Sequence, residues 1–248
     1  MNLKIYYPSF LVNVLQLANK SRRLRLRIVP EAKNQEIIKS VLTTEEQTAM
    51  SPDEIIARLQ EGNHNFVTNS LTKRDHSEQR RLSTIGQYPK ALVLSCSDSR
   101  VPVEDVFDLG IGDIFVARVA GNIEDRAIVG SMEFATALAG SKVVIVMGHT
   151  ACGAVKHAIE VTDAAAMDMN AFDALLKEIH PVVKATPSKG EITSKNIDFT
   201  NRVIENNVLQ IVEDIKTRSP IMASLVNEIK IKIIAAIYDM ETRRVKFL

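Results

Sequence analysis

The chain contains no tryptophan, and aromatic side chains make up only 5% of its 248 residues. So few aromatic residues argue against a platform on which nucleic-acid bases could stack. The formal net charge is +1, so neither sign is in excess to attract nucleic acid or an anionic membrane. No apolar run reaches the roughly 20 residues of a transmembrane helix. We therefore expect a globular protein without a nucleic-acid partner or a membrane span.

Cysteine is also scarce, because Cys96 and Cys152 are the only two in the chain. Two cysteines are too few for the disulfide framework that stabilises small secreted domains. They could form a single disulfide, remain as buried thiols or bind a metal ion, and composition does not choose among these.

Residues 1–50 carry little periodicity, and we expect them to form an N-terminal extension or arm. The apolar run FLVNVLQLA at 10–18 has the length of a signal-peptide core, but a cluster of basic residues follows it instead of preceding it. The sequence therefore favours a cytoplasmic protein whose arm packs on the domain or on a partner subunit. A degenerate export segment is the alternative.

A single domain is expected over residues 51–248. Its first helix has a clear beginning, since Ser51 can cap it, Pro52 suits the first helical position and Glu54 completes a capping box. Short apolar runs typical of buried strands follow at 91–95, 114–120, 142–148 and 231–240. Helical periodicity fills 124–140, 153–161, 171–184, 198–217 and 218–230.

The alternation of strands and helices predicts an α/β fold with a central, mainly parallel sheet flanked by helices. The sheet should hold about four strands, with residues 242–248 as a possible antiparallel edge strand. In such sheets, ligands bind beyond the carboxyl ends of the strands.

Both cysteines stand at such strand ends. Cys96 follows the run at 91–95, while His149 and Cys152 follow the run at 142–148. Thiolate and imidazole groups are the ligands that zinc prefers, and these residues supply three of the four that a tetrahedral site needs. The chain has no third cysteine, and its other histidines lie outside any matching motif. The sequence therefore predicts a zinc site with an open position, which indicates catalysis.

Asp98 and Arg100 add a charged pair beside the first cysteine. A neighbouring arginine keeps an aspartate ionised. Ionised Asp98 could orient a water molecule at the metal, or it could become the fourth ligand and close the site. Taken alone, each of these residues would more often be a buried thiol, a core histidine or a surface ion pair, and only their conjunction favours the metal site.

The segments CSDSR at 96–100 and HTACG at 149–153 together resemble those of the β-class carbonic anhydrases. GDIFVARVAGN at 112–122 and GSMEFA at 130–135 are also similar to segments of that family. The resemblance runs from about Ser51 to the C-terminus and does not cover the first fifty residues.

This resemblance implies one Zn²⁺ per subunit, held by Cys96, His149 and Cys152, with Asp98 and Arg100 as the catalytic pair. It implies reversible hydration of CO2 to bicarbonate and a proton by a zinc-bound hydroxide. It further implies a homodimer or a dimer of dimers. In the family, the residues matching Gln87 and Phe115 come from the partner subunit to the substrate pocket, and Gly153 matches the residue after the second thiolate.

Three positions depart from the pattern of many family members. Phe134 stands where they have an active-site tyrosine, and Val119 where they have asparagine. Val93 stands where some members have a tryptophan that belongs to an inhibitory bicarbonate site. We therefore expect no such inhibitory site and a zinc ion that stays open to water at neutral to alkaline pH.

Three other functions are compatible with parts of these patterns. A hydrolase of carbonyl sulfide or carbon disulfide could use the same ligands with a different pocket. A zinc protein that has lost activity could keep the ligands, although Asp98, Arg100 and Gln87 are all present. A thiol redox protein would predict a disulfide between Cys96 and Cys152 and no metal.

Overall fold

A computed structural model describes residues 36–248, which form one compact unit from Glu36 to Leu248. The apolar run at 10–18 and the basic cluster after it lie outside the described residues. Among residues 36–248, no helix is both long and apolar enough to cross a membrane.

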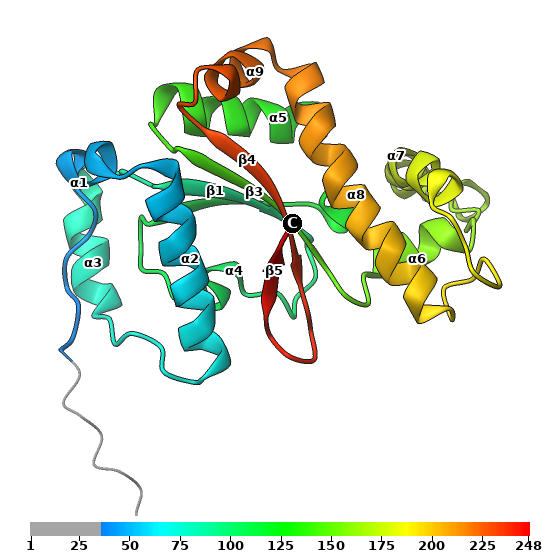
Figure 1. Cartoon of the computed structure of the whole chain (residues 1–248), viewed down its shortest axis with the longest axis horizontal. Coiled ribbons are helices and arrows are strands. Elements are labelled where there is room, and N and C mark those ends of the chain that lie inside the picture. The colour runs from blue at the N-terminus through cyan, green and yellow to red at the C-terminus, as the bar shows by residue number, and fades with distance from the viewer. Residues whose placement is uncertain (1–35) are drawn as a thin grey trace, which may run out of the picture. The chain divides into compact units, whose positions relative to one another are not determined.

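Helices separate all but the last two strands of the described chain (Figure 1). The strands are β1 (Ala91–Ser95), β2 (Ile114–Arg118), β3 (Val143–His149), β4 (Lys232–Tyr238) and β5 (Val245–Phe247). The α-helices are α1 (Thr44–Ala49), α2 (Pro52–Val67), α3 (His76–Leu82), α4 (Val103–Val106), α5 (Arg126–Glu133), α6 (Gly153–Ile159), α7 (Asn170–Ala185), α8 (Ile197–Arg218) and α9 (Pro220–Asn227). Shorter turns are η1 (Ser83–Ile85), η2 (Ala120–Asn122), η3 (Phe134–Leu138) and η4 (Ala165–Met167).

The five strands form one sheet in the order β2-β1-β3-β4-β5. The first four strands are parallel, and β5 pairs antiparallel with β4 at the edge. The expected α/β fold, with about four parallel strands and an antiparallel edge strand, is therefore confirmed. The register pairs Ser95 of β1 with Met147 of β3, so these two strands end side by side.

Alternate residues of the central strands point into two different cores. Val93 and Ile145 face α2 and α4, where they pack with Leu59 and Phe107. Leu94 and Val146 face the opposite layer, which is built from α5, α8 and α9 (Figure 1). Both faces of β1 and β3 are thus covered, which explains why these two strands are apolar without alternation.

The ends of the helices follow local signals. Ser51 accepts a hydrogen bond from the backbone of Glu54, whose side chain bonds back to Ser51, so the predicted capping box begins α2. The expected helix over 124–140 is interrupted, because α5 passes into a π-helical turn at Phe134–Leu138. Gly140 then ends it with a positive φ of 78°.

Residues 36–50 belong to the same compact unit as the helices and strands that follow them. Gln47 of α1 is buried, and its amide donates to the carbonyls of Pro89 and Ala139 at 2.8 and 2.9 Å. These contacts join residues that are far apart in the chain, so local patterns do not reveal them.

Candidate metal centre

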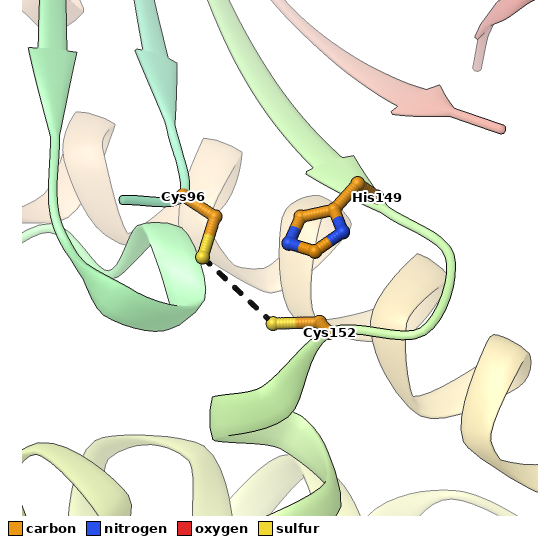
Figure 2. A group of neighbouring side chains, drawn as sticks. All are labelled: Cys96, His149 and Cys152. Atoms are coloured by element: carbon orange, nitrogen blue, oxygen red, sulfur yellow. Dashed lines mark hydrogen bonds between the residues drawn. The ribbon is translucent and has the colours of Figure 1, made fainter. Parts of the chain in front are cut away.

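Three side chains converge where β1 and β3 end. Cys96 follows β1 directly, His149 is the last residue of β3, and Cys152 precedes the first turn of α6 (Figure 2). Because the two parallel strands are neighbours, their carboxyl ends lie at the same edge of the sheet. The side chains that the sequence singled out separately therefore share one place.

The spacing of the ligand atoms suits a small metal ion. The sulfur atoms of Cys96 and Cys152 are 4.0 Å apart, and all three potential ligand atoms lie within 4.8 Å of one another. Two thiolates at about 2.3 Å from a tetrahedral zinc ion would be about 3.8 Å apart. A disulfide would need sulfur atoms about 2.05 Å apart. Both cysteines are free, so the disulfide that a redox protein requires is not formed.

His149 presents one ring nitrogen to the two sulfur atoms. Its Nδ1 lies 2.9 Å from the carbonyl oxygen of Thr150, to which it can donate. Its Nε2 is buried and has no hydrogen-bond partner within residues 36–248. A buried polar atom without a partner is costly, and a metal ion would satisfy it. This orphaned nitrogen between two thiols indicates that the residues present fit a zinc ion.

The carbonyl that orients His149 is itself held in place. The backbone N–H of Thr150 donates to the carbonyl of Tyr238, and its hydroxyl accepts from the N–H of Met240. Ala151 then takes a positive φ of 61°, which turns the chain from β3 into α6. The end of β4 thus fixes the loop that carries His149 and Cys152.

The pKa values of the two thiols are shifted in opposite directions. The hydrogen bond between them lowers the pKa of Cys96 to about 4 and raises that of Cys152, while burial raises both. Backbone N–H groups of Gly121 and Asp98 help to stabilise the Cys96 thiolate. Cys152 is the cap residue of α6, and the first N–H groups of that helix lower its pKa, which offsets part of the increase. The lowered pKa favours the thiolate of Cys96, which is the form in which cysteine binds metals.

Asp98 and Arg100 form the expected pair next to this cluster. Nε and Nη2 of Arg100 donate to the two carboxylate oxygens at 2.9 and 2.7 Å. The bond from Arg100 keeps the pKa of Asp98 well below its usual range, although partial burial opposes this. Oδ2 of this carboxylate is 3.9 Å from Nε2 of His149, so the carboxylate borders the cluster. Both carboxylate oxygens accept hydrogen bonds from Arg100.

Phe115 does not reach the cluster within one chain, and Gln87 precedes β1, whereas Cys96 follows it. Phe115 pairs with Leu92, four residues before Cys96, which corresponds to about 13 Å along a strand. Gln87 is exposed in the loop before β1. Gly153 begins α6 directly beside Cys152, and a methyl group added to it would meet no atom within 4 Å.

The three positions that depart from the family pattern lie in different surroundings. Phe134 is 48% exposed and packs edge-on against Phe115, with ring centroids 5.7 Å apart. The two rings line a hollow of about 550 Å³ beside the edge strand β2. Val93 is fully buried in the sheet core, and Val119 packs against the cores around the site.

Two side chains at this site escaped the sequence analysis. Arg118, the last residue of β2, donates to the carbonyls of Cys96 and Asp98. Asn207 of α8 donates to the carbonyl of Gly121, whose N–H faces the Cys96 sulfur. Arg118 lies inside the segment 112–122 that resembles the family, but nothing in the pattern indicated its contact. Asn207 carries no local signal at all.

Comparisons with known proteins identify the family. A family profile described as carbonic anhydrase matches residues 91–245. The chain is 42% identical over 106 residues to a carbonic anhydrase of Mycolicibacterium smegmatis, which covers 42% of this chain and 52% of that protein. The match thus spans about half the length of this curated relative.

Solved structures show a similar fold. The structure of the beta-carbonic anhydrase CcaA has a TM-score of 0.62 at 26% identity, covering 78% of this chain and 94% of that one. A structure of a tetrameric beta-carbonic anhydrase from Sordaria macrospora has a TM-score of 0.55 at 23% identity, covering 66% and 82%. This second likeness concerns the fold alone.

Proposed function

Since the chain belongs to the carbonic anhydrase family, we propose that it catalyses the reversible hydration of CO2 to bicarbonate and a proton, with zinc held by Cys96, His149 and Cys152. The observation that carries this proposal is Nε2 of His149, which has no hydrogen-bond partner within residues 36–248 and is buried beside two free thiols whose sulfur atoms are 4.0 Å apart. Three ligands leave a fourth tetrahedral position for a reacting molecule.

When bound, zinc supplies the Lewis acidity that makes a water molecule a nucleophile near neutral pH. The protein contributes orientation and charge around it. Asp98 is kept ionised by Arg100, so its Oδ2 can only accept a hydrogen bond. From its place beside His149, this oxygen would accept a hydrogen bond from the attacking water and so orient a lone pair of the water toward CO2. Arg100 holds the carboxylate in that direction.

We propose that a second copy of the chain completes the substrate pocket, in a homodimer or a dimer of dimers. Phe115 stays away from the cluster of its own chain, Gln87 is exposed in the loop before β1, and Phe115 with Phe134 lines an apolar hollow at the open edge of the sheet. An apolar surface of this kind is expected at an interface between subunits. Phe115 would then line the path of CO2 in the partner, Gln87 would bind the substrate, and Gly153 would border the substrate beside Cys152.

The site is proposed to stay open to water at neutral pH. Two supports for this are the bonds from Arg100 that occupy both oxygens of Asp98 and the buried valine at position 93. Closure would require Asp98 to exchange those bonds for the metal.

The test is stopped-flow CO2 hydration by the zinc-loaded protein at about pH 7 and about pH 8.5. Fast turnover at both values, proportional to bound zinc, is the expected result. Activity confined to the alkaline value would refute the open site but keep the enzyme. Stoichiometric zinc without hydration at either value would refute the proposed reaction, and release of sulfide from carbonyl sulfide or carbon disulfide would identify the competing hydrolase.

A further inference from the structure

Arg118 holds the loop that carries both a proposed ligand and the acidic residue of the site. Its Nε donates to the carbonyl oxygen of Cys96 at 3.0 Å, and its Nη2 donates to that of Asp98 at 2.5 Å. The guanidinium group thus joins two carbonyl groups that are two residues apart on the same loop. An arginine fork suits this task because it presents parallel N–H donors in a fixed geometry.

The position of Arg118 follows from the sheet. Arg118 is the last residue of β2 and pairs in register with Ser95, the residue before Cys96. The end of the edge strand β2 therefore lies next to the start of the loop from Cys96 to Arg100. The side chain of Arg118 needs only to cross from one strand end to the next to reach the loop.

Asp98 is held both at its carboxylate and at its backbone carbonyl. Arg100 binds its carboxylate, and Arg118 binds its carbonyl oxygen, which also accepts from the N–H of Val101 at 3.1 Å. Cys96 is held at its carbonyl while its sulfur faces Cys152 and His149. The two bonds from Arg118 therefore restrain the peptide groups that follow Cys96 and Asp98.

We propose that Arg118 is a positioning residue of the metal centre: it fixes the loop from Cys96 to Arg100 so that the thiolate and the Asp98 carboxylate face His149 at the same time. This inference rests on the proposed zinc site. Groups outside the ligand sphere that orient ligands commonly change metal affinity or activity by about 10- to 100-fold when they are removed.

The experiment compares the full chain with Arg118→Ala, Arg118→Lys and Arg81→Ala. Arg81 is a matched control, because it is an exposed arginine whose guanidinium also makes two hydrogen bonds, both to Glu78. Zinc affinity is measured by competition with a chromophoric chelator. The sulfur-to-metal charge-transfer band of the cobalt-substituted protein reports the geometry of the ligands. Circular dichroism and thermal unfolding show whether each variant is folded.

We expect Arg118→Ala to bind zinc about 10- to 100-fold more weakly and to change the cobalt band. Arg118→Lys should recover only part of this, because one compact ammonium group cannot replace the fork. Arg81→Ala should match the unchanged protein. A purely structural role would lower the unfolding temperature of Arg118→Ala while leaving zinc affinity and the cobalt band of the folded protein unchanged, and that result overturns the proposal.

The lysine variant decides the matter if the alanine variant does not fold, since parental zinc affinity and a parental cobalt band in Arg118→Lys would also overturn it. The readouts separate this proposal from the proposed reaction. An unchanged protein that binds zinc but does not hydrate CO2 refutes the reaction and leaves the role of Arg118 testable. An unchanged protein that hydrates CO2, with an alanine variant of equal zinc affinity and band, refutes only the role of Arg118.

Discussion

Oδ2 of Asp98 lies 3.9 Å from Nε2 of His149, the ring nitrogen that has no hydrogen-bond partner within residues 36–248. A carboxylate that is ionised, fixed by an arginine and next to a ligand position can orient a reacting water molecule. The proposed binding of zinc by His149 and the proposed orientation of water by Asp98 therefore depend on different side chains, and the two roles can be tested independently.

Asp98→Asn should keep zinc but lose activity. The substitution preserves the shape of the side chain and removes its charge, so the oxygen next to His149 becomes a weaker acceptor and the ion pair with Arg100 is lost. We expect kcat/KM for CO2 hydration to fall about 100-fold or more, as for other removed proton-handling groups. Stopped-flow rates are compared at equal zinc content, measured by atomic absorption. Asp105→Asn, an exposed acidic residue of α4, serves as the control. Equal rates for Asp98→Asn and the unchanged protein would exclude the proposed role.

Removing either thiol should reduce the sulfur-to-metal charge-transfer absorption by the share of one thiolate. In the cobalt-substituted protein, Cys96→Ser and Cys152→Ser should each lose about half of the sulfur-to-metal charge-transfer intensity, since two thiolates are expected in a site of this kind. Zinc affinity should fall by more than the roughly 100-fold expected for a residue outside the ligand sphere. Ser99→Ala, an exposed neighbour of Arg100, is the control. A full band in either cysteine variant would show that its sulfur is not a ligand.

Stability in acid should depend on Asp108. Burial alone would raise the pKa of Asp108, but hydrogen bonds from Arg74, Thr72 and Asn65 outweigh it and hold the pKa below its ordinary value. The carboxylate is 2% exposed and lies 2.5 Å from Arg74. Because its folded pKa is below its unfolded pKa of about 3.9, its contribution is fully present above that value and is lost as the pH falls through the folded pKa.

Asp108→Asn should therefore reduce the free energy of unfolding at neutral pH by about 3–5 kcal/mol, because it leaves Arg74 without its buried partner. The difference in the free energy of unfolding between the variant and the unchanged protein should become smaller as the pH is lowered. Urea unfolding at a series of pH values measures this. Asp53→Asn removes a 76% exposed partner of Lys232 and should have little effect. A difference that stays constant down to strongly acidic pH would contradict the argument.

Phe134→Asp should weaken the proposed association of subunits. The substitution places a charge in the apolar hollow formed with Phe115, where it could not be desolvated without cost. We expect the particle mass from sedimentation to decrease, with activity falling in the same concentration range. Ile192→Asp alters a residue that is 64% exposed elsewhere on the chain and should preserve both. An unchanged mass for Phe134→Asp would place the interface on another surface.

Much of the fold was predictable because its signals are local. The β-branched runs gave strands at the expected places, and Ser51 with Glu54 forms the expected capping box. The expected helix through 124–140 was interrupted by the turn at Phe134–Leu138, where a shift to π-helical hydrogen bonds leaves no clear mark in the spacing of apolar residues. The packing of Gln47 against Pro89 and Ala139 was equally invisible, because its partners are distant in the chain.

The sequence by itself determined which residues form the candidate site, because Cys96, His149 and Cys152 each follow an apolar strand and parallel strands end at one edge. Only the tertiary structure decided that β1 and β3 are direct neighbours, that Nε2 of His149 has no hydrogen-bond partner among residues 36–248, and that Arg118 binds the carbonyls of Cys96 and Asp98. Strand and helix preferences arise between residues close in the chain. Strand order and side-chain contacts depend on the packing of all the elements at once, and no short segment encodes that sum.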